Sequence, residues 1–572
     1  MDTRTGIKPQ VIVCGLGRTG YHIFSLLQQQ DIAVVGISEH PLPGYPQNIV
    51  IGDMRQDSTL IAAGVHHAQT LLIASNDDAL NVAVMTQARV INPRIRVINR
   101  LFNSRLGDRL DHTLPHHLSM SVASLVAPIF AFAAMGNRAI GHLHLFNYDW
   151  PIEEQVITAD HPWCGRSLHD LWANSSRMLL AYESAVLQTD LITAVMQDET
   201  LRPGDRLLLS SRPSQQRQRS SLQRRMRQLL SSLIHFKRQG RAVLWVLLTL
   251  LVTIAIATFT YISTSTDISV VNALYFSVGM ITGAGGQENV AEHAPDAIKV
   301  FTSVMMIVGA AVIGICYALL NDFILGTHLQ QLWNATQVPD RDHHIICGLG
   351  GVGVRLATQL NTLDSEQVAI EFDPNGRFLG TARNHKIPVV IGDASVPETL
   401  KSVKIHRAKS LLAVTSNDMI NLEIAITAKS MEPRLPVLVR IHDPKFAQQI
   451  QQVFDFDMVM SPTELAAPAF AAAAIGGRIF GNCLTRNGLW FAIATLITAN
   501  HPLHGQTIYE SASKTGFTPL YLEVKGKRIQ GHNLLTTRLE TESVLHLMIP
   551  AKHWDRLWAS RIEHHPPSYQ PM

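Results

Sequence analysis

The sequence predicts two copies of one α/β module on either side of an all-α membrane segment. Three observations predict this fold class. A chain of 572 residues is too long for a single core. Short motifs from the first part of the chain return in its second half, which indicates an internal repeat. Only 16% of the residues are charged, below the usual quarter, and long apolar runs gather near the middle.

The repeat is visible in three short motifs. VIVCGLG at 11–17 returns as IICGLG at 345–350, SND at 75–77 as SND at 416–418, and APIF at 127–130 as APAF at 467–470. Because the motifs keep their order, the two halves are expected to share one fold.

In both copies a predicted strand runs into a GxGxxG loop and then into an apolar helical pattern. The glycines are Gly15, Gly17 and Gly20 in the first copy and Gly348, Gly350 and Gly353 in the second. In such loops the first glycine allows a tight turn, the second lets the backbone approach a pyrophosphate, and the third lets the helix pack on the strand. The helix N-terminus supplies free amides. Two copies in this context predict Rossmann-like nucleotide-binding sheets.

An acidic side chain that bonds the ribose is expected about twenty residues after the glycine loop. In the second copy this residue is Glu371; in the first copy Ser38 holds the same place and Glu39 follows. Successive strand residues face opposite ways, so Glu39 is expected to point away from a ligand. Nucleotide binding is therefore predicted more firmly for the second module. NAD(H) fits the acid, and AMP, ADP or ATP would use the same crevice; a Rossmann-like fold that has lost its ligand is the alternative.

Further polar residues follow other predicted strands. In an open parallel sheet such residues line the ligand crevice. The candidates are Asp53, Asn76 and Arg100 in the first copy and Asp393, Asn417 and Arg440 in the second. Each arginine can clamp a phosphate or form a structural ion pair, and the sequence leaves both open.

Apolar runs at about 242–263 and 299–325 have the length that a spanning helix needs, roughly 20 residues. The run at 268–281 is too short to span, so a re-entrant half-helix is expected there. Irregular backbone follows at 282–286, and such backbone survives at membrane depth only when it lines a cavity or is buried in protein. Gly309 and Gly314 are candidate hinges of the second span.

Charge predicts the orientation of these helices. Nine Lys and Arg residues lie between 212 and 241 with no acid among them, and the positive-inside rule places that side in the cytoplasm. A multi-pass protein of the inner (plasma) membrane with both termini cytoplasmic is expected, with anionic lipid headgroups near the basic linker. A nucleic-acid patch is the alternative for this run, but a net charge of +3 favours no nucleic-acid partner.

Acidic side chains surround the expected half-helix. Asp267 and Glu288 flank it, and no Lys or Arg occurs from 242 to 298, a pattern that concentrates cations at a pore mouth. A plain two-helix anchor with polar loops is the alternative. The five cysteines lack paired spacing and the histidines are scattered, so no metal site is expected.

The segment ALYFSV at 273–278, with the stretch after it, resembles the pore helix and filter of two-transmembrane potassium channels. That family's filter reads TVGYG. The resemblance implies that backbone carbonyls of Thr282, Gly283, Ala284, Gly285 and Gly286 form the filter here. With glycine in place of the family's tyrosine, the filter would be wider or softer.

The two soluble halves resemble RCK domains (regulator of potassium conductance, of the TrkA-N and TrkA-C type). Each Rossmann-like half is followed by an Ala/Phe-rich helix, at 126–135 and 466–475, and then by a smaller lobe. In the family this helix crosses over to pair two lobes. The resemblance implies a first N-lobe at 1–138, a first α+β C-lobe at 139–212, a basic linker at 213–241, a pore domain at 242–327, a linker at 328–342, a second N-lobe at 343–478, a second C-lobe at 479–553 and a tail at 554–572.

The resemblance implies a homotetrameric, nucleotide-gated cation channel, with K⁺ as the expected ion and cytoplasmic modules that control the pore. A membrane-tethered, nucleotide-sensing regulatory subunit of potassium transport, with a degenerate pore, is the alternative. An enzyme is not expected, because no acid/base constellation lies beyond the sheet crevice and a GxGxxG loop shows binding rather than chemistry.

Overall fold

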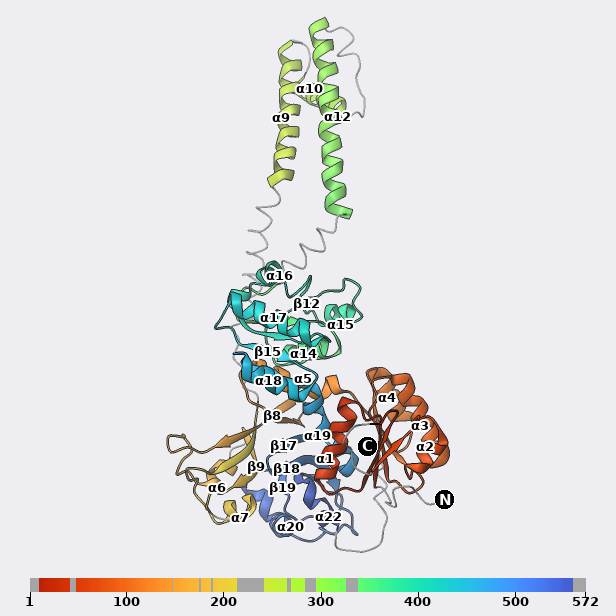
Figure 1. Cartoon of the computed structure of the whole chain (residues 1–572). Coiled ribbons are helices and arrows are strands. Elements are labelled where there is room, and N and C mark those ends of the chain that lie inside the picture. Colours follow the sequence, from red (N-terminus) through yellow and green to blue (C-terminus); the bar gives the residue numbers. More distant parts are fainter. Residues whose placement is uncertain are drawn as a thin grey trace. The chain divides into compact units, whose positions relative to one another are not determined.

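The computed structural model describes residues 10–41, 48–146, 148–173, 176–186, 189–212, 241–264, 269–282, 295–325 and 338–558. The chain divides into two units. Residues 1–215 and 339–572 form one unit, which holds both α/β modules, and residues 216–338 form the other, which holds the apolar helices (Figure 1).

The first module contains a parallel sheet of the order β3-β2-β1-β4-β5-β6. Its strands are β1 (Val11–Cys14), β2 (Val34–Ser38), β3 (Ile49–Ile51), β4 (Thr70–Ile73), β5 (Arg96–Arg100) and β6 (His117–Met120), and its helices are α1 (Arg18–Gln29), α2 (Asp57–Ala62), α3 (Asp78–Ile91) and α4 (Ser104–Thr113). Every residue of β1 is buried, as expected of a central parallel strand that helices cover on both faces.

The second module repeats this sheet with the order β13-β12-β11-β14-β15-β16. Its strands are β11 (His343–Cys347), β12 (Gln367–Glu371), β13 (Val389–Ile391), β14 (Ala408–Ala413), β15 (Val437–Arg440) and β16 (Met458–Met460). Its helices are α14 (Gly351–Thr362), α15 (Leu379–Asn384), α16 (Pro397–Ser402), η1 (Ile405–Arg407), α17 (Asp418–Met431) and α18 (Pro444–Val453). The predicted pair of Rossmann-like modules is confirmed, since both sheets have the order of a dinucleotide-binding fold.

One repeated motif, SND, aligns differently in the structure than in the sequence. Asp77 caps α3 and Asn417 caps α17, each through a side-chain oxygen that accepts from two backbone amides. Asp77 is therefore the counterpart of Asn417, and not of Asp418. Matching the letters SND was wrong by one residue, because the equivalence is set by which side chain caps the helix. Asn76 is accordingly the counterpart of Ser416.

Two buried helices connect the modules. They are α5 (Val122–Ala134) and α19 (Pro462–Gly476). The helix α5 packs on α14 of the second module, α19 packs on α1 of the first module, and the two helices also pack on each other. A helix that is apolar all round must be buried on all sides, which explains their Ala/Phe-rich sequence. The crossing-over that the resemblance implied is thus present within one chain.

An arginine of the first module stabilises the end of α19. The Arg96 guanidinium donates from Nη2 to the carbonyl of Ala474 at 2.7 Å. A cation at a helix C-terminus is favourable because it meets the negative end of the helix dipole. Burial lowers the pKa of Arg96 to about 10. The arginine therefore links strand β5 of the first Rossmann-like sheet to the crossover helix of the other half.

The two smaller lobes share a single nine-stranded sheet, of the order β20-β19-β21-β18-β17-β7-β8-β10-β9. Its strands are β7 (Gly141–Leu145), β8 (Tyr148–Val156), β9 (Arg177–Glu183), β10 (Arg206–Ser211), β17 (Gly481–Thr485), β18 (Gly488–Leu496), β19 (Thr518–Val524), β20 (Lys527–Ile529) and β21 (Val544–Pro550). Short helices accompany it: α6 (Leu168–Trp172), α7 (Leu191–Met196), α20 (Ile508–Thr515), α21 (His532–Thr536), η2 (Ala551–His553) and α22 (Trp554–Trp558).

The junction of the two lobes depends on two glycines. The antiparallel pairing of β7 with β17 places Gly141 opposite Cys483 and Gly481 opposite Leu143. A Cβ atom on Gly141 would lie 2.0 Å from the carbonyl oxygen of Asn482, and one on Gly481 would lie 2.4 Å from the Leu143 side chain. Any side chain at these positions would push the strands apart.

The Asp205 carboxylate fixes the turn before β10 in the first small lobe. It is fully buried and accepts from Tyr182 Oη at 3.0 Å and from the backbone amides of Ala185 at 2.9 Å and Arg202 at 2.8 Å. Replacing Asp205 with Ala is expected to destabilise the protein by roughly 3 kcal/mol, because it leaves buried donors without an acceptor. Thermal unfolding of the detergent-solubilised chain would measure the loss. Ser543→Ala is the control, since Ser543 holds the corresponding turn of the second lobe, and an equal loss there would contradict the role of the carboxylate.

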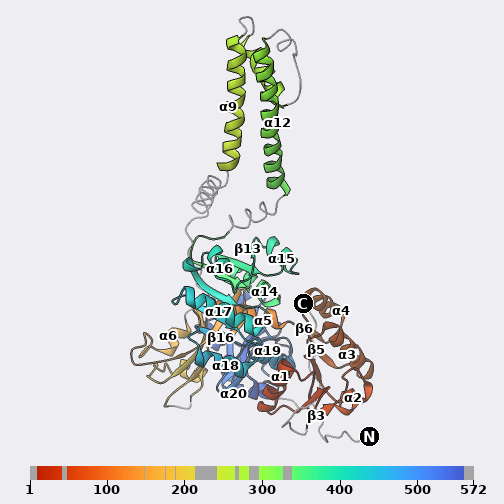
Figure 2. The same cartoon turned by 45° about the horizontal axis from the view of Figure 1, so that its top comes forward.

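The apolar unit consists of α9 (Arg241–Thr264), α10 (Val270–Thr282) and α12 (Asp296–Leu325). Helices α9 and α12 run side by side (Figure 1 and Figure 2). Tyr261 holds the three helices together: its hydroxyl lies 2.8 Å from Thr302 Oγ1, and its ring meets Phe276 edge-on at 4.9 Å. Among the described residues, one helix segment, Asp296–Ile315, is long and apolar enough to span a membrane, and Leu248–Ser263 and Val270–Ile281 are shorter apolar helices.

Large apolar side chains cover the outside of this unit. Leu251, Phe259, Val271 and Ile307 are each between 64% and 74% exposed. Exposed apolar side chains of this size are unfavourable in water, whereas lipid or further copies of the unit would cover them.

Candidate functional site

The carboxyl ends of both Rossmann-like sheets open into one cavity of about 2320 Å³. Its wall includes the glycine loops that follow β1 and β11, the ends of β5, β12 and β15, and the first turns of α5 and α14. Open parallel sheets bind their ligands at this edge. The candidate site is therefore one cavity shared by the two modules.

In the glycine loop of the second module, two of the three glycines are required by the conformation and close packing of the loop backbone. Gly348 has φ +97°, and a Cβ atom there would lie 2.9 Å from Thr415 Cα. A Cβ atom on Gly353 would lie 2.0 Å from the carbonyl oxygen of Gly348. Gly350 is different, because nothing lies within 4 Å of its Cβ direction. Its bare backbone faces the cavity, where α14 begins and offers its free amides.

Glu371 ends β12 and lies against this loop. Its Oε2 accepts from the amide of Leu349 at 2.7 Å, and its Oε1 accepts from the amide of Asp373 at 3.1 Å. The carboxylate is thereby held at the cavity wall beside the glycine loop. This is the place where an acidic residue accepts hydrogen bonds from a ribose.

Asp393 and Asn417 use their side chains locally. Asp393 lines the cavity, and its Oδ1 accepts from the amide and the hydroxyl of Ser395 at 2.9 and 2.8 Å. The Asn417 side chain caps α17 and does not line the cavity, whereas Thr415 and Ser416 do. The loop that the sequence named therefore lines the cavity, but through Thr415 and Ser416 rather than through the predicted Asn417.

Arg440 ends β15 and reaches the cavity beside the glycine loop. Its Nη1 donates to the carbonyl of Val414 at 3.2 Å, and its Nη2 lies 2.7 Å from His442 Nε2. Burial lowers the pKa of the Arg440 guanidinium, and a buried Nε has no protein partner. Among the described contacts, Asp418 reaches the Arg440 guanidinium only through His442, and no carboxylate pairs with it directly.

The first module keeps the glycine loop but lacks the acid. Gly15 and Gly17 line the cavity, and Gly20 packs against the Gly15 carbonyl. Ser38 ends β2 where Glu371 ends β12, and its hydroxyl donates to the carbonyl of His40. Glu39 is exposed and does not line the cavity.

The other first-module candidates divide into those inside and those outside the cavity. Asp53 lies outside and forms an exposed ion pair of 2.7 Å with Arg55. Asn76 and Arg100 lie in the cavity wall. Arg100 donates from Nη1 to Thr19 Oγ1 at 3.3 Å and to the carbonyl of Ala74 at 3.1 Å, and burial lowers its pKa to about 10.

Residues that the sequence did not predict come from across the module boundary. The first turn of α5 lies against the start of α14, so that a Cβ atom on Gly351 would lie 3.9 Å from Ala123 Cβ. Arg355 of α14 donates to the Ser104 hydroxyl of the first module. Gln359, also on α14, donates to Asp149 Oδ2 at 2.9 Å. No local motif signals these contacts, because they depend on how the two halves pack.

The candidate pore residues lie mostly outside the described residues. Gly283, Ala284, Gly285 and Gly286 of the expected filter, and Asp267 and Glu288 of the expected pore mouth, belong to that group. Thr282 is the last residue of α10. The sequence alone therefore carries the filter and pore-mouth predictions.

The two candidate hinge glycines lie within the continuous helix α12 but in different surroundings. A Cβ atom on Gly309 would lie 2.7 Å from the carbonyl oxygen of Ile281, whereas nothing lies within 4 Å of Gly314. Gly309→Ala is expected to separate α12 from α10 and to lower the thermal stability of the unit by roughly 1–3 kcal/mol, the usual cost of overpacking. Gly314→Ala is the matched control and should unfold like the wild type. Equal melting temperatures for all three proteins in detergent would contradict the close contact.

The TrkA-N domain family matches residues 11–113 and 344–462, which are the two Rossmann-like sheets. The two modules are TrkA-N domains. The match confirms the family that the glycine loops, the duplicated sheets and the crossover helices indicated.

Two curated relatives are named as potassium channels, both from Methanocaldococcus jannaschii. Potassium channel protein 1 is 24% identical over 268 residues, 45% of this chain and 79% of the relative. Probable potassium channel protein 2 is 26% identical over 219 residues, 36% of this chain and 62% of the relative. A solved structure described as the GsuK channel bound to NAD matches with 14% identity and a TM-score of 0.47, over 97% of this chain and 79% of that chain.

Proposed function

We propose that this chain is a nucleotide-regulated potassium channel subunit whose second TrkA-N domain binds the ligand. The observation that carries the proposal is the arrangement of Glu371, Gly350 and Arg440 around one cavity. Together they offer an acceptor for a ribose, an open backbone for a pyrophosphate, and a cation for a phosphate. The two relatives named as potassium channel proteins support the transported ion.

The ligand is proposed to be NAD(H) or an adenine nucleotide (AMP, ADP or ATP). Each combines a ribose with at least one phosphate, and these are the two groups that the second module is built to contact. The first module is proposed to contribute its loop, through Gly15 and Gly17, to the shared cavity. Because Ser38 stands where the acid should be, a ribose would bind the first module less tightly.

Ligand binding is proposed to act on both modules at once. The cavity wall contains residues of both, and α5 and α19 each pack on the opposite module. A ligand that contacts both walls stabilises the module arrangement that fits it best, and so biases the equilibrium between two arrangements of the modules. A site in a single module could not do this without a second connection.

The apolar unit is proposed to form the pore of a homotetramer in the inner membrane, with both termini cytoplasmic and anionic lipids near the basic linker. Its exposed apolar faces support lipid or subunit contacts. Thr282 to Gly286 would then be the filter, Asp267 and Glu288 the pore mouth, and Gly309 or Gly314 the gating hinge. The domain boundaries are proposed as the sequence predicts them, and no enzymatic role is proposed.

Flux through liposomes tests the proposal. The purified full chain should conduct K⁺ at a rate that a nucleotide changes. It should also conduct K⁺ faster than Na⁺. Equal K⁺ and Na⁺ flux would contradict the selectivity only. The absence of cation flux with or without each nucleotide would contradict the channel.

A second candidate is a membrane-tethered nucleotide sensor that regulates a separate potassium transporter. The observation that favours it is the sequence TGAGG at 282–286, which lacks the tyrosine of the family filter TVGYG. Changing this stretch to TVGYG discriminates the two. If cation flux appears only in the changed protein, the natural pore does not conduct and the sensor is the better assignment.

A further inference from the structure

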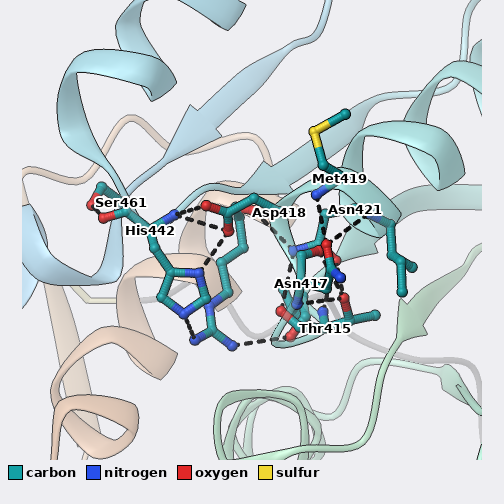
Figure 3. Close-up of polar contacts among 10 residues, drawn as sticks. Thr415, Asn417, Asp418, Met419, Asn421, His442 and Ser461 are labelled. Atoms are coloured by element: carbon teal, nitrogen blue, oxygen red, sulfur yellow. Dashed lines mark hydrogen bonds and ion pairs between the residues drawn. The ribbon is translucent and has the colours of Figure 1, made fainter. Parts of the chain in front are cut away.

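A chain of hydrogen bonds begins at Arg440 and leads away from the cavity. Arg440 Nη2 lies 2.7 Å from His442 Nε2, and His442 Nδ1 lies 2.6 Å from Asp418 Oδ1. Figure 3 shows the His442 ring beside the Asp418 carboxylate. The backbone amide of His442 also donates to both Asp418 oxygens at 3.1 Å. His442 is therefore held at its backbone amide and at both nitrogens of its ring.

The chemistry of the three groups sets the direction of these bonds. An arginine side chain has donors only, so His442 Nε2 must accept from Arg440. The ring proton of the neutral imidazole then lies on Nδ1, where it donates to Asp418. Asp418 is the first residue of α17, a position where a carboxylate is favourable. His442 Nε2 accepts from Nη2 and the Val414 carbonyl accepts from Nη1, so that the Nε–H group of Arg440 is left without a protein partner among the described residues.

The first module lacks this chain. Phe102 stands where His442 stands, and it is 52% exposed. Its ring lies 5.3 Å from the Arg100 guanidinium carbon. Such a cation–π contact does not orient any single N–H group of the arginine. Asp78, the counterpart of Asp418, accepts from the backbone amides of Phe102 and Asn103. Only the second module therefore orients its cavity arginine through a histidine.

We propose that His442 is a positioning residue, which turns the Arg440 guanidinium toward the phosphate of a ligand in the second module. This inference rests on the proposed ligand site. The two residues line the cavity together with Gly348 and Gly350, where a phosphate would lie. An oriented guanidinium binds a phosphate more tightly than a mobile one, because less freedom is lost on binding.

The same histidine connects the site to the crossover helix. The Ser461 hydroxyl donates to the His442 carbonyl at 2.9 Å, and Ser461 immediately precedes α19 (Figure 3). Since α19 packs on α1 of the first module, a shift of Arg440 and His442 on ligand binding reaches the other half of the protein through one hydrogen bond. The residue thus both orients the phosphate contact and lies on the path to the module interface.

Calorimetric titration of the full-length protein in detergent tests the proposal, with ADP and with adenosine as the probes. His442→Phe gives the second module the residue of the first. It is expected to weaken ADP binding about tenfold or more, which corresponds to roughly 1.4 kcal/mol. Adenosine binding should stay within about twofold, because adenosine has no phosphate for Arg440 to contact. His442→Gln should recover part of the ADP affinity, since its amide oxygen can accept from Arg440.

His406→Phe in the same module is the matched control and should leave both titrations unchanged, because His406 is an exposed histidine outside the cavity wall. The proposal is overturned if His442→Phe binds ADP like the wild type. It is also overturned if His442→Phe or His442→Gln loses affinity for ADP and for adenosine equally, because an equal loss would indicate damage to the whole pocket. If the wild type binds neither probe nor NAD(H), the proposed ligand site itself fails, an outcome distinct from the other two.

Discussion

Replacing Gly350 with alanine is expected to weaken nucleotide binding by the second module at least tenfold, or roughly 1.4 kcal/mol. Gly350 precedes α14, and its backbone faces open space in the cavity. A methyl group there would occupy the place where a pyrophosphate approaches the amides of the loop. The φ of −77° suits alanine as well as glycine, so the fold should remain intact. Calorimetry with ADP and NAD⁺ would measure the loss, and thermal unfolding would check the fold.

Two further glycines are the controls for this prediction. Gly17 has the same open surroundings in the first module, but that module has Ser38 in place of the acid, so Gly17→Ala should affect binding less. Gly353→Ala should lower thermal stability instead, because its Cβ would lie 2.0 Å from a backbone oxygen. Undiminished ADP binding by Gly350→Ala would place the pyrophosphate elsewhere.

Replacing Glu371 with glutamine is expected to weaken ribose-containing ligands by about 10- to 100-fold. A hydrogen bond to a charged group contributes about 1.5–3 kcal/mol, and the neutral amide loses most of that contribution. The side chain is nearly the same size, and one oxygen remains to accept from the Leu349 amide, so the loop should keep its shape. The loss should appear in calorimetry with ADP and in the nucleotide dependence of flux.

The 2′-deoxy analogue of ADP isolates the contact to the ribose. The wild type should bind it more weakly than ADP, whereas Glu371→Gln should bind the two nucleotides alike. Ser38→Glu, the reverse change in the first module, supplies the acid where it is missing and should strengthen binding if that module takes a nucleotide. If Glu371→Gln keeps the wild-type preference for ADP over the deoxy analogue, the ribose hydroxyl contacts another group.

Much of the fold follows from the sequence because its signals are local. A strand, a GxGxxG loop and an apolar helix occur in order in each half, and they fix the parallel sheets without knowledge of distant contacts. Glu371 and its missing counterpart at Ser38 were predictable for the same reason. The spacing from the glycine loop to the end of the second strand is set within one βαβ unit.

Other features depend on packing between the halves. The single nine-stranded sheet requires β7 to pair with β17, and only the close approach at Gly141 and Gly481 reveals why glycine occurs there. Aligning the two SND motifs by sequence paired Asn76 with Asn417, although the helix caps show that Asp77 is the counterpart of Asn417. His442 was indistinguishable from the scattered histidines, because its partner Asp418 lies 24 residues away in the sequence.

The most direct test of the central claim is the effect of a nucleotide on K⁺ flux in liposomes that contain either the wild-type chain or Gly350→Ala. The wild type should conduct K⁺ at a rate that ADP or NAD(H) changes. Gly350→Ala should conduct K⁺ at the nucleotide-free rate of the wild type and should not respond to the same concentrations. A wild-type chain that passes no K⁺ under any of these conditions, or a Gly350→Ala chain that responds to nucleotide fully, would contradict a channel regulated through the second TrkA-N domain.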